Sequence, residues 1–238
     1  MTESDATPQL DPAAIDFEQA YRSGAVAEGV VMDRLPWEIG KPQPLLVEFE
    51  RAGRICGDVL DIGCGPGDSS IYLAGLGYRV TGLDLAPTAV ERARARAAEC
   101  EVAVSFAIAD ATELAGYDDR FDTVVSSALL HCLDQGQRAA HVAALRRVMR
   151  PGARLIQFCF ARTEHSDAYA PHSIEESELS GTFDLPDWRR TALRPDVLTA
   201  ITPPPPIREM LAGRGVPLEF DEEGALLLPV WVLEAVRI

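Results

Sequence analysis

The sequence predicts an α/β fold, in which a mostly parallel seven-stranded sheet has helices on both faces and ends in a C-terminal antiparallel hairpin. Short apolar segments alternate with helical patterns between residues 58 and 160, as in strand–helix–strand units, whose strands pair in parallel. A glycine-rich turn joins the first of these strands to its helix. The chain of 238 residues, 47% of them hydrophobic, is long enough to bury one core of this kind. We therefore expect residues 1–238 to form a single domain.

The first 35 residues are expected to form an arm ahead of the sheet, and part of this arm is expected to be disordered. Residues 1–14 are polar and contain proline, a composition that does not support a packed core. A short helix is predicted from about Pro12 to Tyr21, and an irregular segment from Gly24 to Gly40. An apolar helical pattern then follows Pro44 and ends near Gly53.

The central elements follow from hydrophobic periodicity and from turn residues. The strands are short apolar runs, and the helices between them have an apolar face or begin with proline. The predicted strands are 59–62, 78–85, 102–109, 121–128 and 154–160, and the predicted helices are 69–76, 87–98 and 135–149.

Beyond Ala161 the regular alternation ends. Residues 162–190 are polar with scattered aromatic side chains, which is typical of a lid that closes over a substrate site. The alternative is an insertion whose aromatic residues pack on the sheet edge. The remaining expected elements are a helix at 194–200, a proline segment at 203–206 that excludes helix, a helix at 207–214, and strands at 217–221 and 225–236 that form the hairpin.

The composition argues against several classes of partner. The formal net charge is −15, and nucleic acid is best met by a basic surface. No apolar run approaches the roughly 18 residues of a membrane span, and no secretory signal is recognised, so we expect a cytoplasmic protein without a membrane partner. The five cysteines include no Cys-x-x-Cys pair, and the four histidines form no spaced set with acids. We therefore expect neither a disulfide framework nor a metal site.

The turn after the first strand reads Asp61-Ile62-Gly63-Cys64-Gly65-Pro66-Gly67. Glycines here let backbone amides and a helix N-terminus approach a ligand closely. A dinucleotide-binding turn would have its third glycine at position 68, which is Asp68. An acid before the first glycine would repel a pyrophosphate and attract an ammonium group. The turn therefore predicts a cationic or zwitterionic ligand.

Two more carboxylates end neighbouring strands, Asp84 after the second and Asp110 after the third. Ligands of open α/β sheets bind outside these carboxyl ends. Asp84 is placed to accept hydrogen bonds from ribose hydroxyls, and Asp110 to accept one from an adenine amino group. Either aspartate alone is equally consistent with the start of a turn, but together with Asp61 and the glycine turn they favour a ligand site.

The segment from Val59 to Leu85 resembles motif I and the acidic second-strand end of class I S-adenosylmethionine-dependent methyltransferases, a Rossmann-like family. The resemblance covers residues 36–160 well and the tail more loosely. It implies S-adenosylmethionine as cofactor, S-adenosylhomocysteine as product, and methyl transfer as the reaction. The cofactor-binding residues that it implies are Asp61, Gly63, Gly65, Gly67, Asp84, Leu85, Asp110, Ala111 and Ser126, and the fourth-strand end from Ser126 to Ala128 would lie beside the methionine part.

Two further segments narrow the resemblance. The run from Pro36 to Pro44 resembles the segment that leads into small-molecule methyltransferases of the thiopurine methyltransferase-like group. Residues Ser127 to Leu133, with Phe158-Cys159-Phe160, are similar to bacterial heterocyclic toxin methyltransferases. The resemblance implies a small-molecule acceptor, methylated on oxygen or nitrogen of a heteroaromatic ring system. The sequence leaves monomer and homodimer equally open.

Two side chains have both a functional and a structural interpretation. Trp37 either packs its aromatic face against the cofactor sulfonium or anchors the arm in the core. His131 is a candidate general base beside the acceptor, or a structural histidine bonded to backbone. Many methyl transfers need no base, because an acidic hydroxyl or thiol is already ionised. His141, on a predicted amphipathic helix, is expected on the surface.

Three alternatives to this function stay open. The first is an S-methyltransferase acting on a thiol or a chalcogen. The second is a nicotinamide-dependent oxidoreductase, against which Asp68 counts. The third is a non-catalytic S-adenosylmethionine-binding regulatory protein.

Overall fold

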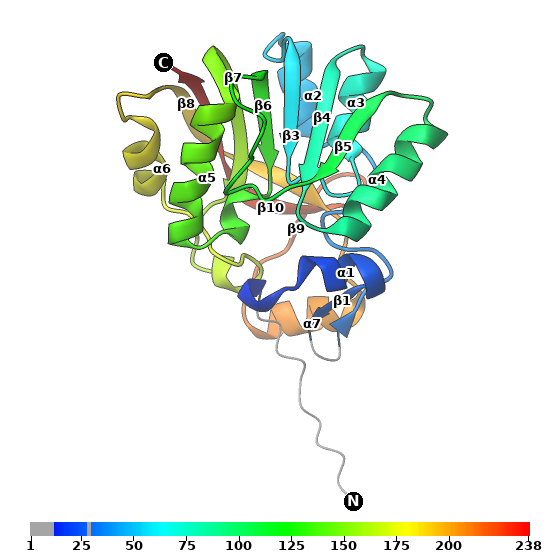
Figure 1. The fold of residues 1–238 in the computed structure, drawn as a ribbon. Coiled ribbons are helices and arrows are strands. Elements are labelled where there is room, and N and C mark those ends of the chain that lie inside the picture. Colours follow the sequence, from blue (N-terminus) through cyan, green and yellow to red (C-terminus); the bar gives the residue numbers. More distant parts are fainter. Residues whose placement is uncertain (1–11, 28–29) are drawn as a thin grey trace, which may run out of the picture.

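The computed structural model describes residues 12–27 and 30–238 and shows a central twisted sheet with helices packed on both faces (Figure 1). Most of the segment predicted to be disordered, residues 1–11, lies outside the described residues. Residues Pro12–Ala14 form a single 3-10 turn, η1, ahead of the first helix.

The main sheet has eight strands within the described residues, in the order β5-β4-β3-β6-β7-β10-β8, with β9 paired to β10. Strands β3 to β7 are parallel, whereas β10 is antiparallel to both β7 and β8. This topology confirms the Rossmann-like α/β prediction with antiparallel strands at its C-terminal end. The bounds are β3 Asp58–Ile62, β4 Arg79–Asp84, β5 Val104–Ile108, β6 Phe121–Ser127, β7 Met149–Phe160, β8 Trp188–Ala200, β9 Glu219–Phe220 and β10 Leu226–Arg237.

The two faces of the sheet are buried by different helices. Because side chains alternate along a strand, Leu60 and Ile62 of β3 join one core with α5 and α6, whereas Val59 joins a second core with α2 and α3. Helix α4 adds a third cluster around Phe106 on β5. The bounds are α2 Pro44–Arg51, α3 Asp68–Gly75, α4 Pro87–Glu99, α5 Gln135–Val148 and α6 Glu176–Phe183.

The carboxyl ends of the parallel strands are covered by elements from both ends of the chain (Figure 1). Near the N-terminus these are α1 (Phe17–Ser23) and the short antiparallel pair β1 (Ala25–Ala27) and β2 (Val30–Val31), which replaces part of the predicted irregular segment. Near the C-terminus it is α7 (Pro205–Gly213), whose Ile207 packs against the apolar cluster of the N-terminal arm.

The C-terminal third contains the largest errors of the sequence prediction. Residues 194–200 are not a helix but the second half of the 13-residue strand β8. Pro195 lies in this strand, opposite Trp231, and is tolerated because β8 is an edge strand that pairs only with β10 among the described strands. The predicted strand at 217–221 shrinks to the two residues of β9, so β8, not β9, is the main hairpin partner of β10.

Two other predictions in this region need correction. The lid predicted at 162–190 is divided, because its second half contains α6 and the first residues of β8, with Phe183 and Trp188 buried in the core. The proline segment at 203–206 also does not exclude helix throughout. Helix α7 starts at Pro205, since the first turn of a helix needs no N–H from its residues.

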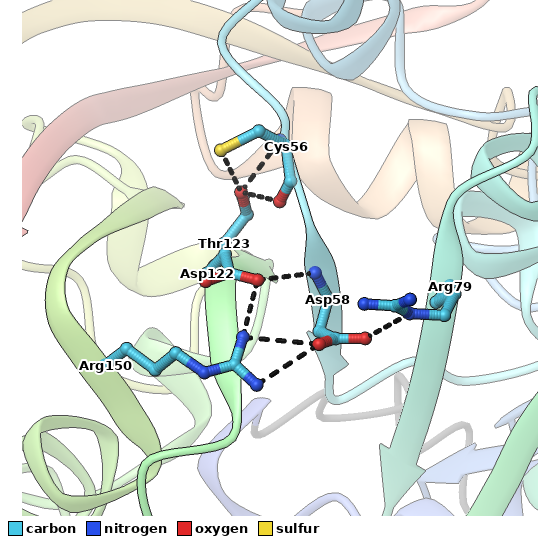
Figure 2. Close-up of polar contacts among 6 residues, drawn as sticks. All are labelled: Cys56, Asp58, Arg79, Asp122, Thr123 and Arg150. Atoms are coloured by element: carbon cyan, nitrogen blue, oxygen red, sulfur yellow. Dashed lines mark hydrogen bonds and ion pairs between the residues drawn. The ribbon is translucent and has the colours of Figure 1, made fainter.

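The amino ends of the parallel strands are joined by a cluster of charged side chains (Figure 2). The Arg150 guanidinium donates to Asp122 Oδ2 at 2.6 Å and to Asp58 Oδ2 at 3.2 Å, and Arg79 Nε donates to Asp58 Oδ1 at 2.6 Å. The backbone N–H of Asp58 also donates to Asp122 Oδ2 at 2.8 Å. This strand-start cluster links β3, β4, β6 and β7 at the edge opposite the covered ends.

No helix within residues 12–27 and 30–238 is both long and apolar enough to cross a membrane.

Candidate active site

A cavity of about 780 Å³ opens where β3, β4, β5 and β6 end. Its volume lies in the upper part of the range of roughly 300–1,000 Å³ found for ligand sites. Its other walls come from the N-terminal arm, the loop after β7, helix α7 and the ends of β8 and β10. The predicted residues on its walls are Trp37, Asp61, Gly63, Gly65, Asp84, Leu85, Asp110, Ala111 and His131, whereas Gly67 and Ser126 are not on them.

The glycine turn approaches the cavity through Gly65. Its φ is +51°, and a β-carbon there would lie 2.8 Å from the Tyr21 hydroxyl, so only glycine leaves this surface open. Gly67 instead allows close packing, because a β-carbon there would lie 2.9 Å from the ring of Phe106. With φ +85°, Gly67 is also the N-cap of α3.

Asp84 holds the turn in place from the end of β4. Its Oδ2 accepts from the Gly65 N–H at 2.8 Å, and its Oδ1 accepts from the Ala86 N–H at 2.9 Å. Burial raises the pKa of this carboxyl. A carboxylate has about four acceptor positions, so Asp84 retains capacity for hydroxyl groups of a ligand in the cavity.

Asp61 and Asp68 flank the glycine turn in different ways. Asp61 is 2% exposed and accepts from the Ser70 Oγ hydroxyl at 2.6 Å, and burial raises its pKa to about 6. Asp68, which replaces the third dinucleotide-turn glycine, forms an ion pair with Arg96 of α4. Arg96 also donates to the Pro66 carbonyl at 2.7 Å, so this pair fixes the outer side of the turn.

Asp110 and Ala111 follow β5 and form the far wall. One carboxylate oxygen of Asp110 accepts from the N–H and the hydroxyl of Thr112 at 2.7 and 2.6 Å, and these bonds lower its pKa. The Ala111 carbonyl accepts from His141 Nδ1 at 2.8 Å. The expectation that His141 lies on the surface is wrong, because the residue is 0% exposed and supports this wall from behind.

Of the strand end from Ser126 to Ala128, which the resemblance assigns to the cofactor site, only Ser126 needs correction. Ser126 is fully buried in β6 and its hydroxyl does not reach the cavity. Successive strand residues face opposite sides, and the residues that line the cavity here are Ser127, Ala128 and Leu129.

His131 lies on the cavity wall but does not have the geometry of a general base. It is 3% exposed, and its Nδ1 accepts the Phe160 backbone N–H at 3.0 Å, so the basic lone pair is already used. Burial lowers its pKa to about 3, helped by the charges of Arg138 and His172. A general base works best with a pKa near the operating pH, so the base interpretation of His131 is not supported.

Tyr21 is a site residue that the sequence analysis missed. It is 4% exposed, its hydroxyl lies over Gly65, and it accepts from Trp37 Nε1–H at 2.9 Å. Trp37 also packs against Phe17, with ring centroids 5.5 Å apart. Trp37 therefore anchors the arm and lines the cavity at once. No local pattern marks Tyr21, since its partners are distant in sequence.

The cavity suits S-adenosylmethionine better than a pyrophosphate ligand. The acidic residues Glu18, Asp61, Asp84 and Asp110 are among those that line it, and Lys41 is the one lysine or arginine among the described residues that do so. Carboxylates next to an open glycine backbone fit ribose hydroxyls and an ammonium group.

The comparisons with known proteins agree with this site. The family described as "Methyltransferase domain" matches residues 59–152. The chain is 38% identical to the 2-heptyl-1-hydroxyquinolin-4(1H)-one methyltransferase of Mycobacteroides abscessus over 165 residues, which is 68% of this chain and 72% of that protein.

A similar solved structure is described as "Conversion of a Disulfide Bond into a Thioacetal Group during Echinomycin Biosynthesis". It has a TM-score of 0.76 and 31% identity, and the match covers 93% of this chain and 91% of that one. A Burkholderia thailandensis 1,6-didemethyltoxoflavin-N1-methyltransferase shares the fold, with a TM-score of 0.58, 19% identity, and coverage of 82% and 76%.

The chain belongs to the class I S-adenosylmethionine-dependent methyltransferases. Its reaction is therefore methyl transfer, and S-adenosylmethionine is its cofactor.

Proposed function

We propose that this methyltransferase modifies an oxygen or nitrogen atom of a small, planar heteroaromatic compound, and that N-hydroxyquinolones are the first class to test. The observation that supports this most directly is an aromatic wall in the same cavity as the glycine turn. The rings of His131 and Phe160 stack at 3.9 Å and 20°, and Tyr169 meets Phe160 edge-on at 5.4 Å. Flat rings of this kind favour a planar partner.

The cavity also has room for an apolar substituent. Ile207 and Leu211 of α7, together with Val216 and Leu226, give its walls an apolar part. The name of the M. abscessus relative states that the compound which that protein methylates is a quinolone with a heptyl chain. An alkyl-substituted heteroaromatic acceptor is therefore consistent with the shape and polarity of this site.

We assign the cofactor to the half of the cavity formed by the strand ends. Asp84 and Leu85 would hold the ribose, Asp110 and Ala111 the adenine, and the backbone of Gly63 and Gly65 with Asp61 the amino-acid part. When bound, S-adenosylmethionine supplies an electrophilic methyl group on a sulfonium. The chain contributes orientation of the two reactants and exclusion of water, the latter with the help of residues 163–171 after β7, which are the part of the predicted lid that we retain.

Calorimetry tests this proposal first. Purified protein should bind S-adenosylmethionine and S-adenosylhomocysteine and should not bind NADH. A panel of hydroxylated, thiolated and nitrogen-containing heteroaromatics then follows, with the methylated product identified by mass spectrometry. Tight cofactor binding without product from any of these compounds would overturn the proposed acceptor class.

A sulfur acceptor is the second candidate. One solved structure, whose description concerns the conversion of a disulfide bond into a thioacetal group, matches 93% of this chain at 31% identity. Product from thiols alone in the same panel would select this alternative.

We further propose a cytoplasmic enzyme of one domain that acts without nucleic acid or membrane, as a monomer or homodimer. Light scattering on the eluting peak of a gel filtration column distinguishes the two oligomeric states.

A further inference from the structure

We propose that His131 donates a hydrogen bond from Nε2–H to the reacting atom of the acceptor, and that the enzyme takes acceptors that are already ionised there. This inference rests on the proposed function. It narrows the acceptor class to heteroaromatics with an acidic hydroxyl, such as N-hydroxy compounds, and it separates them from ordinary alcohols and weakly acidic phenols.

The proton of His131 is located by its hydrogen bond to the main chain. The Phe160 N–H donates to Nδ1 at 3.0 Å, and a nitrogen that accepts this bond carries no proton of its own. In a neutral imidazole the other nitrogen then has the hydrogen. Nε2–H is therefore the polar group that His131 offers to the cavity that it lines.

The surroundings keep this form in place. The ring is stacked on Phe160 and buried. The backbone of His131 is also fixed, because its carbonyl accepts from the His172 N–H at 2.9 Å. Arg138 of α5, which donates to the carbonyls of Leu130 and His172, and His172 itself both oppose a second proton on the ring.

Cys132 and Tyr169, two other titratable groups on this part of the wall, do not replace a base. Burial raises the pKa of Cys132 to about 12 and raises that of Tyr169, so both remain protonated near neutral pH. Glu164 and His165 lie on the loop after β7, where the Glu164 side chain is 88% exposed. Among the described residues, the two charged groups that act on the His131 ring are Arg138 and His172, and neither lines the cavity.

The reaction then balances without an enzyme base. The acceptor loses its proton to solvent before it binds as an oxyanion. A bond forms between this oxygen and the methyl carbon, the carbon–sulfur bond breaks, and its electron pair returns to sulfur. The charges of oxyanion and sulfonium cancel in the products, and the His131 proton stays on Nε2 throughout.

The ionisation of a bound acceptor tests the proposal directly. The probe is 1-hydroxyquinolin-4(1H)-one, bound together with S-adenosylhomocysteine so that no transfer occurs, and titrated by ultraviolet absorbance across about pH 5 to 9. A donor at the oxyanion favours the anion by about tenfold or more, which lowers the midpoint by about one pH unit relative to the free probe. For wild-type protein kcat/KM should rise with ionisation of the free acceptor.

Paired substitutions separate this role from a structural one. In His131→Asn the side-chain oxygen can still accept the Phe160 N–H, but the donor at Nε2 is lost, so the midpoint should return towards that of the free probe. In His131→Gln an amide N–H can occupy the place of Nε2–H and should restore part of the shift. Asp187→Asn, a change at an exposed ion pair with Arg146 outside the cavity, should keep the wild-type midpoint, and calorimetry with S-adenosylhomocysteine reports whether the cofactor site of each variant is intact.

The outcomes also separate this inference from the proposed function. An unchanged midpoint in His131→Asn, or wild-type protein that binds the neutral probe more tightly, would overturn the donor role while methylated product leaves the proposed function standing. The absence of product from every oxygen and nitrogen acceptor would overturn both.

Discussion

Asp84 combines two tasks in one carboxylate, since it holds the glycine turn through Gly65 and faces the cavity at the proposed ribose position. We predict that Asp84→Ala weakens S-adenosylmethionine binding by about tenfold or more, because hydrogen bonds to a charged group contribute about 1.5–3 kcal/mol. Calorimetry measures this loss. Asp187→Asn, which changes only an exposed ion pair with Arg146, is the control, and wild-type affinity in a folded Asp84→Ala protein would refute the assignment.

Asp61 makes folding stability depend on pH. Burial raises its pKa in the folded protein from 3.8 to about 6. Between these two pH values the folded state keeps a proton that the unfolded state has released. The free energy of unfolding of the wild type must therefore fall as the pH rises from the lower value to the higher one. Asp61→Asn has no such loss. Between about pH 5 and 7, its free energy of unfolding should therefore increase by about 1 kcal/mol relative to that of the wild type. Urea unfolding at several pH values measures these free energies. The same pH dependence in the wild type and in Asp61→Asn would contradict the prediction.

Individual site residues were predictable from the sequence where an apolar strand ends in an aspartate. Asp61, Asp84 and Asp110 follow three apolar runs, and parallel pairing alone brings them to one cavity. The roles of Tyr21 and His141 depend on contacts with Gly65 and Ala111, which no local pattern encodes. The resemblance assigned the strand end from Ser126 to Ala128 to the site, but it did not show which face of the strand each residue takes, so the burial of Ser126 was missed.

At the scale of elements, the strand-start cluster stabilises the sheet from the edge opposite the cavity. Asp122 accepts from both Arg150 and the Asp58 N–H, and these bonds lower the pKa of its carboxyl. A lowered folded pKa adds stability above the ordinary aspartate value of 3.8, and this stability is lost as the pH falls below it.

Asp122→Asn should therefore cost about 1–2 kcal/mol of unfolding free energy at neutral pH and less in acid, where wild type has lost the same charge. Urea denaturation at the two pH values measures the difference. Asp187→Asn again serves as the exposed comparison and should change stability by less than about 0.5 kcal/mol. Equal losses for Asp122→Asn at both pH values would show that charge is not the cause.

Elements were predictable from the sequence where periodicity and parallel connections agree, as they do from β3 to β7. Strand β8 was not predicted, because Pro195 and its charged neighbours lie on an edge strand with one partner strand. Its sequence therefore shows neither a continuous apolar run nor strict alternation. Its identity depends on pairing with β10, a contact that becomes evident only in three dimensions.

At the scale of the whole molecule, the N-terminal arm completes the cofactor side of the cavity. Glu18 of α1 accepts from the N–H and hydroxyl of Thr88 at 3.0 and 2.7 Å, which docks the arm on α4. The Tyr21 hydroxyl accepts from Trp37 and keeps its own hydrogen for the cavity over Gly65.

We predict that Tyr21→Phe weakens cofactor binding by about three- to tenfold, the loss of one hydrogen bond of about 1 kcal/mol, with little change in melting temperature. Calorimetry and thermal unfolding measure the two effects. Tyr78→Phe removes a hydroxyl that contacts Glu50 outside the cavity and should bind the cofactor as wild type does. Equal affinities in the two variants would show that Tyr21 has no part in the site.

The elements that cover the carboxyl ends of the parallel strands come from both ends of the chain, and this has a consequence for how the protein is made. Helix α1 and helix α7 meet through the cluster around Tyr21 and Ile207, and the cavity walls extend to Pro229. A ribosome adds about 5–20 residues per second and releases the first part of the chain long before the last. The nascent chain therefore has every strand-end aspartate in place while it still lacks α7 and the start of β10, and the cavity can enclose the ligand completely only after these segments have been synthesised.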